Sequence, residues 1–115
     1  MVQNRCGAYT TDETLLEAPL LTLIAWMRER RLSPVELEDA HIRRIERVNP
    51  GLNALVAQRF DAAREEAALA EREYATAPRP RPLLGVPFTV KETTPVEGVP
   101  TTFGLPRFHD DAMTL

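Results

Sequence analysis

Lys91 is the side chain whose position in this sequence best suits a chemical role. It directly follows an apolar stretch at residues 85–90, which is typical of a buried strand, and it precedes an irregular loop. Sites in α/β proteins form at strand ends. A lysine partly withdrawn from water is more easily deprotonated, and the neutral amine can act as a base toward a hydroxyl nucleophile. The alternative is an exposed lysine in an ion pair with Glu92 or Glu97.

Other side chains that could do chemistry favour ordinary roles. His41 lies on an apolar helical face, which predicts a packed histidine. Residues 109–111, His-Asp-Asp, lack the further ligands and fixed geometry that a metal site needs. Cys6 has no partner cysteine, and Trp26 is expected to pack on its helix. The glycines at residues 85, 98 and 104 do not form a phosphate-binding pattern.

Helices precede Lys91 in the predicted order of elements. Ser33, Pro34 and Glu36 form a capping box, with serine as N-cap, proline at the first helical position and glutamate at the third. The helix that begins there is expected to stop near the Asn-Pro-Gly at residues 49–51. Apolar periodicity predicts further helices over residues 20–30 and 60–75.

Two short strands complete the predicted pattern. They cover residues 53–57 and 85–90, and a proline-rich extended linker at residues 76–82 precedes the second. The order of helices and strands indicates an α/β fold, but two strands do not make a stable sheet. We therefore expect a flexible leader over residues 1–19 and an incomplete α/β domain over residues 20–115.

Composition excludes several classes of protein. A net charge of −3 gives no basic surface for nucleic acid or anionic lipid. No signal-peptide pattern or apolar run long enough to cross a membrane is present. The single cysteine favours a reducing compartment, and we expect a cytoplasmic location.

Several segments together resemble the amidase signature family. The lysine segment of that family resembles residues 84–92, LGVPFTVKE, followed by residues 98–104, GVPTTFG. The family's opening helices resemble three upstream segments in order and spacing: LSPVEL at 32–37, AHIRRI at 40–45 and NPGLNA at 49–54. The resemblance extends from about residue 20 to residue 106.

The resemblance implies an enzyme that cleaves carboxylic amides. Members use a serine nucleophile, a second serine on a cis peptide, and a lysine that matches Lys91. The lysine serves as base and acid through the middle serine, and a glycine- and serine-rich segment further along supplies both serines. The implied fold is a mixed β-sheet flanked by helices. The implied substrate is a small-molecule amide, and no cofactor is implied.

Three departures from the family pattern affect the expected activity. Glu92 stands where aspartate is usual, and Leu105 stands where a small residue is common. The chain has one serine, Ser33, which is predicted to cap a helix. Residues that act as a unit lose nearly all activity when one is missing. We therefore expect an N-terminal, truncated fragment of an amidase domain that is inactive alone and whose partner is the missing C-terminal part.

The chain also carries threonines that could replace serine in principle. They are too near Lys91 in sequence to recreate a site built from distant segments: Thr93, Thr94, Thr101 and Thr102. The alternatives to an amidase fragment are a small interaction module, which would use its helices or the Pro-Arg-Pro-Arg-Pro at residues 78–82, and one half of a split amidase. A third is an amidotransferase subunit, since transamidating enzymes share the pattern.

Overall fold

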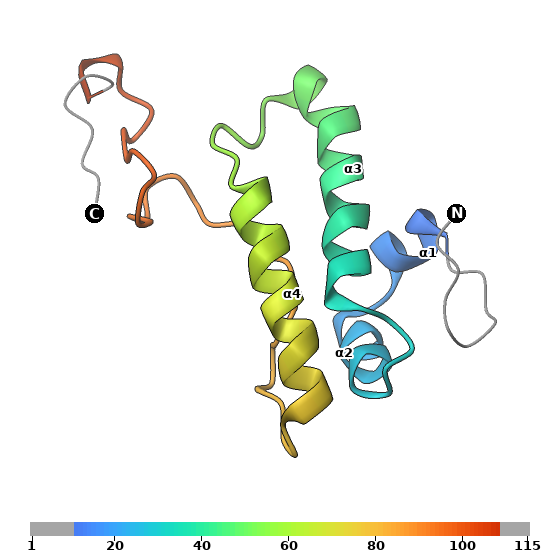
Figure 1. Cartoon of the computed structure of the whole chain (residues 1–115). Helices are drawn as coiled ribbons and strands as arrows, with labels where there is room; N and C mark the ends of the chain where they lie inside the picture. The colour runs from blue at the N-terminus through green and yellow to red at the C-terminus, as the bar shows by residue number, and fades with distance from the viewer. Residues whose placement is uncertain (1–10, 109–115) are drawn as a thin grey trace. The chain divides into compact units, whose positions relative to one another are not determined.

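The computed structural model describes residues 11–108, and this part of the chain is mainly helical (Figure 1). It divides into two compact units: a helical unit of residues 11–52 and 59–87, and a loop unit of residues 53–58 and 88–108. The elements are α1 (Asp12–Glu17), α2 (Leu20–Arg28), α3 (Pro34–Leu52), α4 (Phe60–Thr76) and the 3₁₀ turn η1 (Pro106–Phe108). None of these helices is long and apolar enough to cross a membrane.

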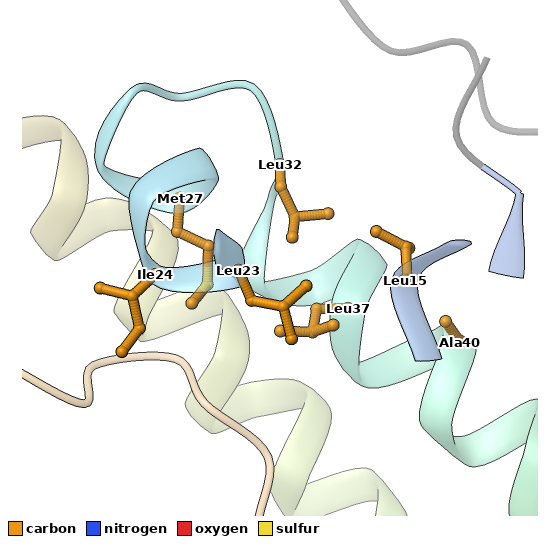
Figure 2. Packing of buried hydrophobic residues seen from close by; sticks show 7 residues of the cluster. All are labelled: Leu15, Leu23, Ile24, Met27, Leu32, Leu37 and Ala40. Carbon is orange, nitrogen blue, oxygen red and sulfur yellow. The ribbon is translucent and has the colours of Figure 1, made fainter. Parts of the chain in front are cut away.

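The core of the helical unit is built on the apolar face of α2 (Figure 2). Leu23, Ile24 and Met27 are buried there, as the helical spacing of these residues predicts, and Met27 is 1% exposed. The core cluster also contains Leu15 of α1, Leu32 of the α2–α3 connection, and Leu37 and Ala40 of α3. Burial of these side chains is the main force that holds the unit together.

The capping box at the start of α3 is confirmed. The Ser33 hydroxyl accepts a hydrogen bond from the Val35 amide at 3.1 Å, and the Glu36 carboxylate accepts one from the Ser33 amide at 3.0 Å. Two backbone donors that an isolated helix would leave unpaired are thereby satisfied. The predicted helix start is therefore correct.

The same helix ends at Leu52, one residue beyond the predicted stop near residues 49–51. α3 continues through Pro50 to Leu52. A proline removes one backbone donor, and so close to the helix end this loss affects a single hydrogen bond. The helix ends where Asn53 adopts the left-handed conformation, with φ of 50°, which asparagine tolerates better than most residues.

The two predicted strands are not observed, so the expected first strands of a mixed sheet are wrong for residues 11–108. Asn53 ends α3, and Val56 in the segment that follows is 67% exposed. Gly85 lies in a turn with φ of 71°, and Phe88 is 83% exposed. A strand exists only when another strand supplies its hydrogen-bond partners. Within the described residues the pairing amounts to one isolated antiparallel bridge between Val96 and Val99.

Helix α1 was missed by the sequence analysis, which assigned its residues to the leader. Thr11 caps it by accepting a hydrogen bond from the Thr14 amide at 3.3 Å, and Leu15 is buried. Six residues are too few for a clear helical period, so the sequence signal was weak. The leader boundary at residue 19 stays a prediction.

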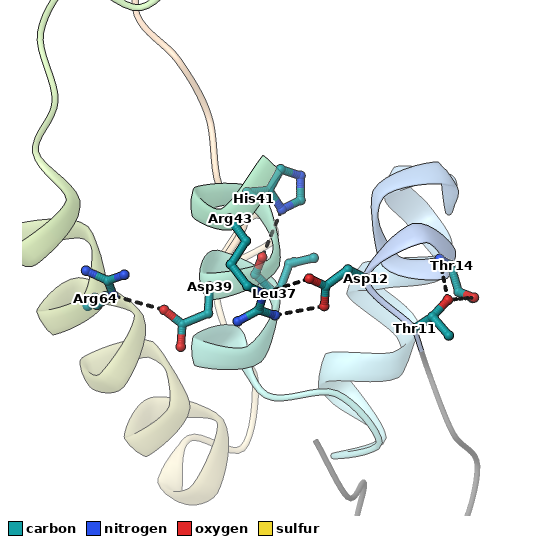
Figure 3. Close-up of polar contacts among 8 residues, drawn as sticks. All are labelled: Thr11, Asp12, Thr14, Leu37, Asp39, His41, Arg43 and Arg64. Carbon is teal, nitrogen blue, oxygen red and sulfur yellow. Dashed lines mark hydrogen bonds and ion pairs between the residues drawn. The ribbon is translucent and has the colours of Figure 1, made fainter. Parts of the chain in front are cut away.

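Ion pairs join α3 to the helices on either side of it (Figure 3). Arg43 of α3 binds Asp12 of α1 through two hydrogen bonds of 2.6 and 2.8 Å. Asp39 of α3 accepts a hydrogen bond from Arg64 of α4 at 2.9 Å. The hydrogen bond from Arg43 lowers the pKa of the Asp12 carboxyl. These contacts lie on the charged face of α3, opposite its buried apolar residues.

The alanine-rich helix α4 matches its predicted range closely and buries Ala67 and Ala70. The proline-rich linker that follows is tied back to the same helix. Arg81 binds Glu73 through hydrogen bonds of 2.7 and 3.1 Å, and the Tyr74 hydroxyl donates to the Leu84 carbonyl at 2.9 Å. These contacts hold the linker and the residues after it against α4 within the helical unit.

Candidate active site

Lys91 lies in the loop unit with its side chain exposed. Its carbonyl accepts a hydrogen bond from the Thr94 amide at 2.8 Å, which closes a tight turn over residues 91–94. The expected strand end and the expected withdrawal from water are not seen. Among the described ion pairs none involves Lys91, so the alternative of a pair with Glu92 or Glu97 is not seen either. The catalytic role of Lys91 stays a prediction.

The neighbouring residue, Glu92, makes the main polar contacts of the loop unit. Its Oε1 atom accepts hydrogen bonds from the Thr102 amide, from the Thr102 hydroxyl at 2.8 Å and from the Phe103 amide at 3.0 Å. Hydrogen bonds from the Thr102 amide and hydroxyl lower the pKa of the Glu92 carboxyl, because they favour its charged form. The residue next to Lys91 is therefore bound to a segment ten positions further along.

The chain returns between these two segments through a second turn. The Val99 amide donates to the Val96 carbonyl at 3.0 Å, and Gly98 has φ of 72° at the third position of the turn. A positive φ at that position is the mark of a type II turn and explains the glycine. The turn brings Thr101, which is 3% exposed, and Thr102 back toward the lysine segment.

The hydroxyl groups near Lys91 are not arranged as nucleophiles. Thr93 and Thr94 are exposed, and the Thr102 hydroxyl donates to Glu92 while it accepts from the Gly104 amide at 3.2 Å. Ser33 belongs to the helical unit, where its hydroxyl caps α3. Among the described hydrogen bonds, none joins a hydroxyl group to the Lys91 amine.

The remaining candidates take structural roles where they are described. The Nδ1 atom of His41 is 2.8 Å from the Leu37 carbonyl one turn earlier in α3 (Figure 3). Trp26 packs against the core with the Arg31 guanidinium 5.8 Å from its ring centre. No group of three or more potential metal ligands occurs within residues 11–108. Cys6 and the His-Asp-Asp at residues 109–111 lie outside the described residues.

Glu92 is the residue whose part in this segment the sequence analysis missed. Glu92 stands where the family usually has aspartate, but the sequence does not indicate which groups bind its carboxylate. The available signal was an acidic residue beside the candidate lysine, followed by a glycine turn and the donor-rich Thr-Thr-Phe-Gly at residues 101–104. Such a signal is weak because it does not say which donors the carboxylate reaches.

The chain belongs to the amidase family, whose model matches residues 36–113. It is 36% identical over 104 residues to an acylamidase from Rhodococcus erythropolis, an alignment that covers 90% of this chain and 22% of the relative. It is 37% identical to human fatty-acid amide hydrolase 2, covering 85% of this chain and 20% of the relative.

A transamidating relative is similar to the same part of the chain. A glutamyl-tRNA(Gln) amidotransferase subunit from Granulibacter bethesdensis is 39% identical, covering 82% of this chain and 18% of the relative. The chain thus spans about a fifth of the length of the curated relatives it matches. No solved structure matches it.

Proposed function

We propose that this chain is the lysine-bearing N-terminal region of an enzyme that hydrolyses carboxylic amides, with Lys91 as its general base and acid. The observation that supports the proposal is the family match over residues 36–113, because that segment contains Lys91 together with the turn that carries it. The names of the matched relatives, an acylamidase and a fatty-acid amide hydrolase, suggest the same class of substrate.

In the proposed reaction, neutral Lys91 accepts a proton from a hydroxyl nucleophile, directly or through a second hydroxyl. The nucleophile attacks the amide carbonyl, and the C–N bond breaks as the lysine returns the proton to the leaving amine, which leaves the acyl group on the nucleophile. Water then attacks this ester, gives up a proton to the same lysine and releases the carboxylic acid, and the nucleophile regains its proton. Lys91 is exposed in the described structure. The proposal therefore requires the rest of such an enzyme to cover Lys91, because desolvation is what makes a lysine a base near neutral pH.

We further propose that the 115-residue polypeptide by itself does not hydrolyse amides. Its one serine, Ser33, is committed to the N-terminus of α3 through the bond from the Val35 amide. The purified chain should release no measurable amine from simple aryl or aliphatic amides. Turnover that disappears in Ser33→Ala or in a threonine variant would contradict this part of the proposal.

A chimera tests the role of Lys91 directly. This chain would replace the matching 22% of the Rhodococcus acylamidase, and hydrolysis of an aryl amide would be followed. Lys91→Met should lower kcat by about a hundredfold to ten-thousandfold, the usual contribution of a general base. Arg79→Met, which removes an exposed cation from the linker, is the matched control and should leave kcat unchanged. A Lys91→Met chimera as active as its parent would refute the assignment.

Transfer of the amide nitrogen is a second candidate function, supported by the 39% identity to the amidotransferase relative. This chain can also be co-expressed with a downstream amidase segment as two separate polypeptides. Amide hydrolysis by the pair would indicate a split amidase, and its absence would favour an amidase that needs both parts in one polypeptide.

A further inference from the structure

We propose that Glu92 is a positioning residue for Lys91. Its carboxylate binds the backbone of residues 102–103 and so holds the turn over residues 91–94 in one conformation. The conformation of this turn sets the direction in which the Lys91 side chain projects from the backbone. The inference rests on the proposed catalytic role of Lys91 and deepens it. It concerns the loop unit alone.

The contacts converge on one atom. Glu92 Oε1 accepts two backbone hydrogen bonds, from Thr102 and Phe103, and one from the Thr102 hydroxyl. Successive amides that point at one anion form a concave binding site of the kind called a nest. Here the anion is a side chain of the same protein, so the nest closes a loop of ten residues.

The backbone of the nest is in a costly conformation. Phe103 has φ of 55° and Gly104 has φ of 67°, so two consecutive residues lie in the left-handed region. For phenylalanine this conformation costs roughly 1–2 kcal/mol relative to the right-handed one. Phe103 is 50% exposed, and its ring packs edge to face against that of Phe108 with 6.5 Å between the ring centres. Three hydrogen bonds to Glu92 favour this conformation, together with the turn closed by the Leu105 amide on the Thr102 carbonyl at 3.0 Å and the bond from the Gly104 amide to the Thr102 hydroxyl at 3.2 Å.

Glu92 and Lys91 are adjacent, so whatever fixes the Glu92 backbone also fixes that of Lys91. The Lys91 carbonyl is already held by the Thr94 amide at 2.8 Å. With Glu92 bound to the opposite segment, the turn is restrained on both sides. An exposed lysine keeps a free side chain, but its point of attachment is fixed.

The test uses the full 115-residue chain and nuclear magnetic resonance. Lys91 is the only lysine, so selective ¹⁵N-lysine labelling yields one backbone signal that reports on the turn. Uniform labelling adds the Thr102 and Phe103 amides. In the parent chain, the chemical shifts of both amides and of the Glu92 carboxyl carbon should change together as the pH is varied. They should share one midpoint, which lies below the usual pKa of glutamate.

Variants separate positioning from a purely structural role. Glu92→Ala should speed hydrogen exchange of the Thr102 and Phe103 amides at least tenfold and lower the ¹H–¹⁵N heteronuclear NOE of Lys91. Glu92→Gln keeps an acceptor oxygen, so it should retain part of the order but lose the pH dependence. Glu97→Gln removes an exposed carboxylate from the same unit and should change none of these values.

Two results would overturn the proposal: a Lys91 signal as ordered in Glu92→Ala as in the parent, or an amide titration that persists in Glu92→Gln. The single indole of Trp26 lies in the helical unit and shows whether each variant is folded there. No readout depends on turnover. An inactive chimera would count against the amidase proposal and would leave the effect of Glu92 on the turn standing. A Lys91 signal that is already disordered in the parent chain would count against the positioning role of Glu92 and would leave the amidase proposal standing.

Discussion

The helical unit and the loop unit are stabilised by different interactions. The helical unit buries a continuous apolar cluster, in which Leu37 and Met27 are almost completely shielded from water. The loop unit leaves Phe88 and Phe103 at least half exposed. Its described contacts include turns, the hydrogen bonds of one carboxylate, Glu92, and a ring contact between Phe103 and Phe108.

The two units therefore differ in how their stability depends on pH. Apolar burial depends little on pH and is spread over many contacts, whereas a carboxylate clamp depends on one ionised group. Lys91, the candidate catalytic residue, belongs to the loop unit. Functional residues are often carried by loops, whose conformation must then be held by a few specific polar contacts.

The largest expected effect is on the apolar core of the helical unit. Leu37 is 0% exposed. Leu37→Ala should lower the free energy of unfolding by about 2–5 kcal/mol, through lost burial and the cavity it leaves. Urea denaturation followed by Trp26 fluorescence measures this. Leu69→Ala, at a site 58% exposed, is the control and should have a far smaller effect. Similar losses in both variants would mean that the described core does not stabilise the unit.

The next largest effect is expected at Gly85, where the chain leaves the helical unit. A Cβ there would lie 2.9 Å from both Cβ and Cγ of Pro34, and the backbone has φ of 71°. Gly85→Ala should cost about 2–4 kcal/mol, the sum of left-handed strain and overpacking. Differential scanning calorimetry measures the loss.

Gly98→Ala is the matched variant in the loop unit. Gly98 has φ of 72°, but a methyl group added there would have nothing within 4 Å, so strain alone should act, at about 1–2 kcal/mol. That loss should appear as local disorder around residues 96–99, leaving the melt of the helical unit unchanged. An equal effect on that melt from both variants would show that the two units unfold as one.

A smaller effect is expected from the ion pair between α1 and α3. Arg43 and Asp12 are each about half exposed, so Arg43→Met should cost less than about 1 kcal/mol at neutral pH. The pKa of Asp12 is lowered in the folded chain, so the pair stabilises above the usual aspartate pKa, and this contribution is lost as pH falls through the lowered value. The difference between parent and variant should therefore vanish in acid. A constant difference would contradict this account.

The smallest effect on global stability, and the most selective, is expected from protonating Glu92. The lowered pKa of this carboxyl means that its hydrogen bonds stabilise the loop unit at neutral pH and are lost as pH falls through that lowered value. The protection factors of the Thr102 and Phe103 amides should fall in acid, while those of the α3 amides stay unchanged. Simultaneous loss of protection in both units would remove the distinction between them.

Local sequence signals determined much of the helical unit. The Ser33–Glu36 capping box and the spacing of Leu23, Ile24 and Met27 predicted helix starts and buried faces correctly, because such interactions join residues within four positions of one another. The lysine segment and the upstream segments, taken together in their order, also identified the family, since both the segments and their order are visible in the sequence.

What required the tertiary structure was every feature that depends on a distant partner. The apolar residues 85–90 have a strand-like composition, yet within residues 11–108 no neighbouring strand pairs with them. α1 could be recognised only in the structure, where Leu15 packs in the core cluster with residues of α3 and Asp12 binds Arg43. The reach of Glu92 across ten residues was equally hidden. The composition of a segment determines its intrinsic preference for helix or strand. Strand pairing and side-chain burial also depend on which other segments of the fold lie next to it.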